Sequence, residues 1–294
     1  MGIAEVIPGV SGGTVALIVG LYQTLINAIA NAVLALRQLV GIGTGKPSAR
    51  ASASTLRALP WRTLIPVAIG MVIALVVGAR FLEPLLEEHP VRMRALFFGL
   101  VLAGVYVPAH MVIRTAPGAW RVKDLAIGAV AAVFLFWLTG LPPGNIADPN
   151  PVVIVLAAAV AICALVLPGV SGSFLLLSIG MYETTISAVN ERDFGYIALF
   201  GLGAVIGLGS FVTLLRWLLA HRARVTLVII TGLMVGSLRA LWPWQSEDRD
   251  LLAPAGDIPM VLLLFAAGIV AVVGLILIER KLGISEEEGQ TAKQ

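Results

Sequence analysis

The sequence predicts an all-α polytopic membrane protein with two inverted repeats, each a re-entrant, broken-helix hairpin followed by transmembrane helices. Composition, a repeated motif and the charges of the loops predict this class. Of 294 residues, 59% are hydrophobic and 13% are charged, whereas a soluble domain carries roughly 25% charged residues. Uncharged runs at 95–113, 194–215 and 258–278 approach the ~20 residues that cross a bilayer core.

Charge and reactive side chains exclude several other classes. The net charge of +3 lies mostly in loops, so it reports on membrane orientation, and we expect no nucleic-acid partner. The single cysteine, Cys163, has no partner for an internal disulfide. His89, His110 and His221 are too dispersed for a metal site. We therefore expect neither a metal nor a cofactor.

A repeated motif divides the chain into two units. Residues 4–29 and 164–189 share 13 identities in 26 positions without a gap, and both contain PGVSG. A weaker match follows, in which Gly70 and Gly99 correspond to Gly203 and Gly232. The sequence thus predicts one repeat over 1–141 and a second over 142–294. Internal repeats of this kind are typical of transporters.

Loop charges predict how the repeats are oriented. Residues 37–62 carry five basic residues and no acid, so we expect a polar cytoplasmic loop there. The following loops alternate in sign, which predicts a multi-pass protein of the bacterial cytoplasmic (inner) membrane with a cytoplasmic C-terminus. The expected spans lie near 63–82, 93–113, 124–141, 195–218, 224–242 and 258–279.

This alternation requires residues 152–190 to enter and leave the membrane on one side. The stretch is too long for one span and is interrupted by Pro168 and Gly169, so we expect two half-helices that turn at PGVSG. The first copy then dips from the cytoplasm, although 14–36 is long enough to cross fully. By the repeat spacing, the first limb of the first hairpin would precede Met1. We expect the true start codon to lie upstream; the alternative is that this copy has lost that limb and begins within the membrane.

The two PGVSG tips are candidates for an anion site. Proline interrupts the preceding helix, and glycine lets the backbone approach a ligand closely. A helix follows each tip, with Ser11 or Ser171 near its N-cap, and its first amides and dipole attract an anion. The alternative is a pair of kinks that pack helices through small residues. The candidate phosphate-binding residues are Pro8, Gly9, Val10, Ser11, Gly12, Gly13, Thr14, Pro168, Gly169, Val170, Ser171, Gly172 and Ser173.

Other polar residues in or near the apolar segments are functional candidates by default. Glu5 and Glu183 flank the tips, and either is a candidate to carry a coupling ion, H⁺ or Na⁺. Tyr22 and Tyr182 occupy matching positions beside the tips. A guanidinium suits a phosphate head group, but snorkelling to the interface is equally ordinary for arginine. The candidate head-group arginines are Arg80, Arg94, Arg216 and Arg239.

The stretch EVIPGVSGGT at residues 5–14, with Gly20 and Tyr22 following, resembles the signature of the PopT-type polyprenyl-phosphate translocases. The resemblance extends over essentially the whole chain, although Glu5 stands where members often have aspartate. It implies a flippase that returns undecaprenyl phosphate, or a related lipid carrier, from the outer to the cytoplasmic leaflet for cell-envelope synthesis. Its substrate would be a polyprenyl-phosphate lipid, and the oligomeric state is not predicted.

Two rival functions fit parts of the sequence. An ion-coupled transporter or channel for a small anion would use the same inverted hairpins. An intramembrane serine protease would explain G-x-S-G, but a nucleophilic serine needs a nearby base, and His110 is the one histidine well inside an expected span. The nucleophile elbow also requires a preceding strand, so we expect a protein that is not an enzyme.

Overall fold

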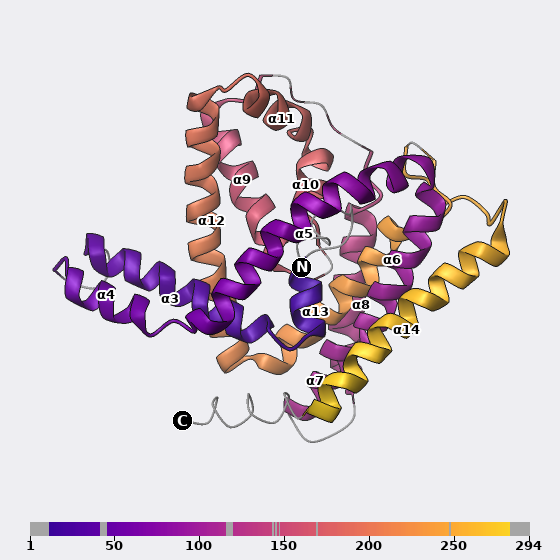
Figure 1. Cartoon of the computed structure of the whole chain (residues 1–294), viewed down its shortest axis with the longest axis horizontal. Helices are drawn as coiled ribbons and strands as arrows, with labels where there is room; N and C mark the ends of the chain where they lie inside the picture. The colour runs from indigo at the N-terminus through magenta and orange to yellow at the C-terminus, as the bar shows by residue number, and fades with distance from the viewer. Residues whose placement is uncertain are drawn as a thin grey trace.

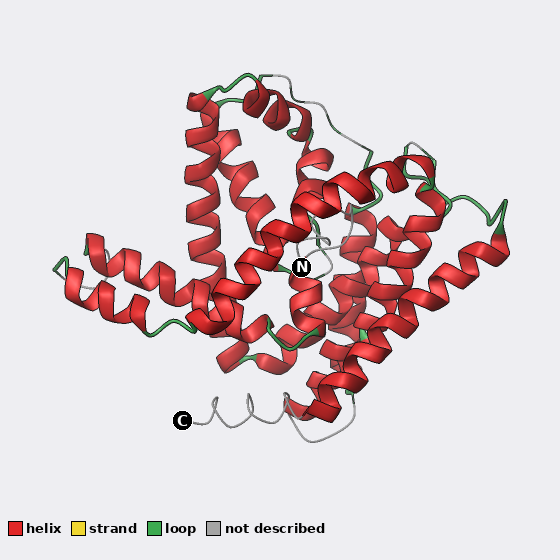
Figure 2. Ribbon diagram, viewed as in Figure 1, coloured by secondary structure: helices red, strands yellow, loops and turns green. Residues whose placement is uncertain are grey.

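The computed structural model describes residues 12–41, 46–115, 120–142, 144, 146, 148–168, 170–246 and 248–282, without the side chains of 12, 14, 75, 76, 78–84, 86, 87 and 278–282. Regular structure within these ranges is helical (Figure 2). The elements are α2 (Gly12–Ile18), α3 (Tyr22–Val40), α4 (Ala49–Arg57), α5 (Trp61–Glu88), α6 (Pro90–Gly104), α7 (Tyr106–Thr115), α8 (Val122–Leu138), α9 (Pro151–Val166), α10 (Gly172–Ile179), α11 (Tyr182–Asn190), α12 (Phe194–His221), α13 (Ala223–Ser237), η1 (Leu238–Leu241) and α14 (Ile258–Leu282).

The helices confirm the membrane class. Within the described residues, four helical stretches are long and apolar enough to cross a membrane: Pro90–Thr115, Phe194–His221, Ala223–Leu241 and Ile258–Leu277. Two bent helix pairs raise the number to six if each pair is one span. Each of the six expected spans coincides with a helix or with two consecutive helices. The chain is therefore a multi-pass, all-α membrane protein.

Three pairs of long helices form the body of the molecule (Figure 1). α12 packs along α9, α13 along α8, and α14 along α6. Glycines allow the close approach: a methyl group added at Gly203 would overlap the carbonyl of Val155, and one at Gly232 would overlap that of Gly128. Helix association in a membrane depends on such close packing because lipid is as apolar as the side chains themselves.

The core lies where the beginning of the described chain meets helices from both halves of the sequence. Ala16 and Tyr22, from α2 and α3, pack in one buried cluster with Val101 of α6, Val212 of α12 and Met234 of α13. The α2–α3 segment is thus surrounded by helices from both halves of the sequence.

A buried ion pair adds a polar connection between the two halves of the sequence. Arg224 of α13 donates from Nε and Nη2 to Oδ2 of Asp124 in α8, at 3.0 and 2.6 Å. Asp124 also accepts a hydrogen bond from the backbone N–H of Arg121 at 3.0 Å. Because both charged groups are largely shielded from solvent, loss of either would leave an uncompensated charge between α8 and α13.

The sequence repeat reappears as repeated local structure. Gly20 and Gly180 have φ angles of 72° and 87°, a conformation that glycine adopts readily. After each, an amide reaches back to a carbonyl five residues earlier: Leu21 to Ala16 and Met181 to Leu176, both at 2.8 Å. This is the Schellman arrangement that ends a helix, so α2 and α10 terminate in the same way.

The longer helices also correspond in length. α5 and α12 have 28 residues each, and α6 and α13 have 15 each. All four helix ends are shifted by the same number of positions, the separation that relates Gly70 to Gly203. The weak sequence match after the motif therefore marks a real correspondence of elements.

The stretch expected to be a polar loop at 37–62 is partly helical. α3 continues to Val40, and α4 occupies Ala49–Arg57. The Ser48 hydroxyl caps α4 by accepting from the N–H of Ala51 at 3.2 Å, and Thr55 donates to Gln38 of α3 at 2.9 Å. α4 is rich in alanine and serine. The face that contacts α3 is therefore not marked in the sequence by a stripe of large apolar residues.

Candidate functional site

The second PGVSG motif forms a tight turn between two packed helices. α9 ends at Val166, and α10 begins at Gly172 and returns alongside it (Figure 1). A methyl group at Gly172 would lie 2.5 Å from the carbonyl oxygen of Ala161, so only glycine permits this approach. Pro168 and Val170 are buried in the turn. We call residues 167–173 the second tip; Gly169 lies outside the described residues.

The limb after this tip bends a second time. α10 and α11 meet at 104° across Gly180 and Met181, a break that the sequence alone did not predict. Ile146 donates to the carbonyl of Gly180 at 2.8 Å, and Thr184 donates to that of Ile146 at 2.7 Å. These bonds tie α11 to the segment that precedes α9.

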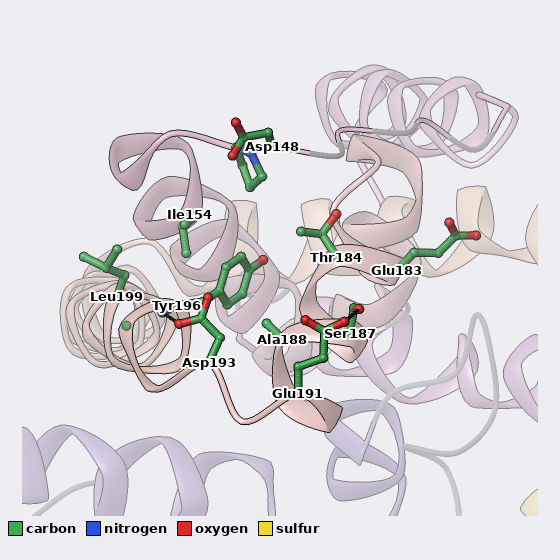
Figure 3. Close-up of a pocket in the computed structure, with 12 residues that line it drawn as sticks. Asp148, Ile154, Glu183, Thr184, Ser187, Ala188, Glu191, Asp193, Tyr196 and Leu199 are labelled. Atoms are coloured by element: carbon green, nitrogen blue, oxygen red, sulfur yellow. Dashed lines mark hydrogen bonds between the residues drawn. The ribbon is translucent and has the colours of Figure 1, made fainter.

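The two ends of the stretch 152–190 lie close together. Asp148 and Pro149 line the same pocket as Glu191 and Asp193 (Figure 3). In Figure 1, α11 lies beside the ends of α9 and α12 at the top of the view. The chain thus runs down α9, turns at the second tip and returns to its starting level before α12 begins.

Serine side chains line the start of α10. The Ser171 side chain is buried and accepts from the N–H of Phe174 at 3.4 Å. Its hydroxyl also shares a hydrogen bond with that of Ser173 at 3.0 Å, and Ser173 is exposed. A helix start with hydroxyl groups and the positive end of the dipole suits an anionic oxygen.

Tyr22 brings the first repeat to the second tip. Its hydroxyl donates to the carbonyl oxygen of Val166 at 3.1 Å, one of the last carbonyls of α9. The side chain of Tyr22 is buried, whereas the matching Tyr182 is exposed. The two tyrosines, expected to be equivalent, therefore have different surroundings.

Most of the first tip, the PGVSG motif at residues 8–12, lies outside the described part of the chain. Glu5, Pro8, Gly9, Val10 and Ser11 lie outside the described residues. Gly12 and Thr14 belong to α2, but the Thr14 side chain is not described, and Gly13 is half-buried. What the structure describes near this tip is α2, which packs against α9, α6, α7 and α14.

Glu183 lies on α11 and lines an open pocket of about 680 Å³ (Figure 3). Three more carboxylates line it, those of Asp148, Glu191 and Asp193. Among the described residues, the lining contains none of the second tip. The structure therefore separates Glu183 from Ser171, which the sequence had grouped together.

The candidate arginines are distributed over several helices. Arg216 of α12 donates to the side-chain oxygen of Asn31 in α3 at 2.8 Å. Arg239 of η1 lies over the ring of Phe136, with 5.2 Å from the guanidinium carbon to the ring centroid. Arg94 is half-buried on α6, and the side chain of Arg80 lies outside the described residues.

One buried arginine was not predicted from the sequence. Arg249 is 9% exposed, although it lies in the acid-rich stretch SEDRD that the sequence places in a loop. Its Nη1 donates to the carbonyl of Leu141 at 2.8 Å and to the hydroxyl of Ser178 at 2.9 Å. No local pattern reveals this, because the loop turns inward only through tertiary contacts.

Comparison with known proteins gives consistent matches. A family model described as undecaprenyl phosphate translocase-like matches residues 1–258. A polyprenyl-phosphate transporter of Vibrio cholerae is 36% identical over 245 residues, which cover 83% of this chain and 75% of that protein. A polyprenyl-phosphate transporter of Staphylococcus aureus is 26% identical over 259 residues, 83% of each chain. No solved structure matches.

Proposed function

Because the chain belongs to the undecaprenyl phosphate translocase-like family, we propose that it transports polyprenyl phosphate across a membrane. The observation that carries this proposal is the family match over residues 1–258. Two relatives named polyprenyl-phosphate transporters support it, since each aligns with 83% of the chain. We propose a transporter without an enzymatic step.

We propose transport from the outer to the cytoplasmic leaflet of the bacterial cytoplasmic (inner) membrane, with the C-terminus in the cytoplasm. The basic residues of 37–62 and the acid-rich stretch 245–257 support this orientation, because positive loops are retained on the cytoplasmic side. Transport against a gradient requires an energy source, and we propose coupling to an ion, for which H⁺ and Na⁺ are the candidates.

The head group is the part of this substrate that cannot cross unaided. Its polyprenyl tail is apolar and can stay in lipid, whereas a charged phosphate in the bilayer core is costly. We propose that the phosphate passes the second tip, where Ser171, Ser173 and the first amides of α10 receive it. Irregular backbone is tolerated at membrane depth only where it is buried in protein or lines a watery cavity. The non-helical backbone between α9 and α10 therefore supports a position for the phosphate beside the second tip.

We further propose that the repeats are inverted relative to each other, so that the first tip approaches from the cytoplasmic side. Equal lengths for α5 and α12, and for α6 and α13, support two copies of one unit. The pairing of α13 with α8 and of α6 with α14 supports a crossed arrangement, in which each helix contacts a partner from the other repeat.

A leaflet assay tests the proposed function. The full-length protein is reconstituted into vesicles with a fluorescent polyprenyl phosphate, and a membrane-impermeant quencher reports the outer-leaflet fraction over time. We expect faster exchange than in protein-free vesicles. Replacing Ser171 by alanine removes the cap on α10, which is worth about 1 kcal/mol, and should slow exchange several-fold.

Ser187→Ala is the matched control, because Ser187 is an exposed serine of α11 that bonds to Glu191 at 2.9 Å, away from the tip. It should exchange lipid like the unmodified protein. Exchange no faster than in protein-free vesicles, together with uptake of a small anion such as inorganic phosphate, would refute lipid transport and favour the small-anion carrier.

A further inference from the structure

Two arginine side chains of the second repeat converge at the end of α8. The guanidinium of Arg239 lies so close to Gly140 that any side chain at this position would overlap it. The guanidinium of Arg249 donates to the carbonyl of the next residue, Leu141, at 2.8 Å. Residues 239 and 249 therefore bring two positive charges to the same short segment of backbone.

The described part of the chain supplies no carboxylate to this pair. The salt bridges within the described part of the chain join Arg92 to Asp257 and Arg224 to Asp124. Neither includes Arg239 or Arg249. Arg249 is 9% exposed, and both its burial and the nearby charge of Arg239 lower its pKa. Arg239 is half-buried, and placing its charge beside that of the buried Arg249 is costly unless an opposite charge pairs with them.

Aromatic rings hold both guanidinium groups in place. Arg239 lies over Phe136 at 5.2 Å, and Arg249 lies over Phe174 at 4.3 Å from guanidinium carbon to ring centroid. Such cation–π contacts restrict the planar group without occupying its N–H donors. Among the described residues, the side-chain contacts of Arg249 are Phe174, Leu141 and Ser178, which leave Nη2 and Nε unused.

The unused donors are accessible. Where the structure describes side chains, no fully buried nitrogen or oxygen lacks a hydrogen-bond partner. Among the described residues, the guanidinium of Arg239 lies against the ring of Phe136 and the backbone of Gly140, and no described hydrogen bond uses its donors, so these are not fully buried. Two adjacent planar forks with free N–H groups match the tetrahedral oxygens of a phosphate, which arginine binds in bidentate fashion.

This site is connected to the second tip through α10. Phe174 lies in the first turn of α10, and Ser178, which bonds to Arg249, lies one turn later. At about 1.5 Å per residue, Ser171 and Ser178 are separated by about 10 Å along the helix. A phosphate held by the two arginines would thus be one short step from the tip.

We propose that Arg239 and Arg249 form a binding site for the phosphate head group of the lipid, which holds it before it moves along α10 to the second tip. This inference rests on the proposed function, because it takes a polyprenyl phosphate as the ligand. It adds Arg249 to the arginines considered from the sequence and separates the capture of the head group from its passage at the tip.

Equilibrium binding tests the site. The full-length protein in lipid nanodiscs is titrated with fluorescent polyprenyl phosphate, with the dephosphorylated polyprenol and with inorganic phosphate. We expect Arg239→Gln to weaken binding of polyprenyl phosphate about tenfold or more, because a charge-assisted bond is lost. Binding of the polyprenol should be unchanged, since it has no phosphate to recognise.

Arg249→Lys serves as the second variant because Arg249 is buried and a neutral residue there risks misfolding. It keeps the charge but not the planar fork, so a several-fold loss of affinity is expected in a folded protein. Arg92→Gln is the matched control, since Arg92 pairs with Asp257 at 3.2 Å on an exposed surface. Its affinity for polyprenyl phosphate should equal that of the unmodified protein.

The outcomes separate this inference from the proposed function. If the unmodified protein binds and moves polyprenyl phosphate and both variants bind it equally well, the arginine site is refuted and the proposed function stands. If the protein binds only inorganic phosphate, and Arg239→Gln abolishes that binding, the lipid head group is refuted as the ligand together with lipid transport.

Discussion

Tyr22 and Tyr182 occupy matching positions of the repeat but have different roles in the structure. Both begin the helix that follows a glycine with positive φ. Tyr22 is buried in the core and bonds to the end of α9, whereas Tyr182 is exposed beside α10. The same local geometry thus places one side chain between the repeats and the other at the surface.

We predict that Tyr22→Phe destabilises the protein by about 1 kcal/mol, because the carbonyl of Val166 loses its donor. For a protein of this size, that corresponds to about 2–4 °C in the midpoint of thermal unfolding in detergent. Tyr182→Phe is the matched control and should change the midpoint by less than about 1 °C, as expected of a surface substitution. Equal effects of the two substitutions would contradict the role of the Tyr22 hydroxyl.

At the scale of elements, α5 and α12 have the same length and matching positions in the sequence, but their environments differ. α12 packs along α9, with Gly203 against the backbone of Val155. In α5, a methyl group added at the matching Gly70 would have no described neighbour within 4 Å, and Ile69 and Ile73 beside it are exposed. The same small residue is therefore a packing requirement in α12 and not in α5.

We predict that Gly203→Leu is strongly destabilising and Gly70→Leu is not. A leucine at position 203 must push α12 away from α9, and overpacking of this kind costs about 1–3 kcal/mol or more. At position 70 the larger side chain enters open space and gains helix propensity of up to about 1 kcal/mol. The midpoint of unfolding in detergent checks both substitutions, and a comparable loss at position 70 would contradict the environment described for α5.

At the scale of the whole molecule, the path of the chain around the second tip decides which ends share a membrane face. Asp148 and Glu191 line one pocket, although α9, α10 and α11 lie between them in the sequence. α12 then runs for 28 residues and ends at His221, next to Arg222, a length of about 42 Å at 1.5 Å per residue. This length is similar to that of a bilayer with its head groups.

We predict that cysteines at 148 and 191 are labelled from the same side of the membrane, and that one at 222 is labelled from the other. Asp148→Cys, Glu191→Cys and Arg222→Cys are made singly in a Cys163→Ser background, which keeps a donor for the carbonyl of Gly207. In intact cells an impermeant maleimide should react at 148 and 191, and at 222 only after permeabilisation. Labelling of 148 and 191 from opposite faces would exclude the re-entrant path.

The class and most helices were predictable from local signals. Long uncharged runs predicted the spans because a bilayer core demands apolar length, and the PGVSG motif predicted the break between α9 and α10 because proline and glycine interrupt helices. The residues 5–14 predicted a family that the comparisons confirm. α4 was missed because alanine and serine make up most of residues 49–54 and carry no stripe of large apolar side chains. The bend at Gly180 was missed although a signal was present, since a glycine followed by the polar residues 183–185 is typical of a helix end.

What the sequence by itself determined is the membrane class, the repeated motif and the family, since each depends on hydropathy, identity and motif along the chain. Only the tertiary structure decided that Tyr22 reaches the end of α9 and that Glu183 lies apart from the second tip. It also decided that Arg249 turns inward to join Arg239. These are contacts between segments up to 144 positions apart, and their partners are set by how helices pack, which no local pattern encodes.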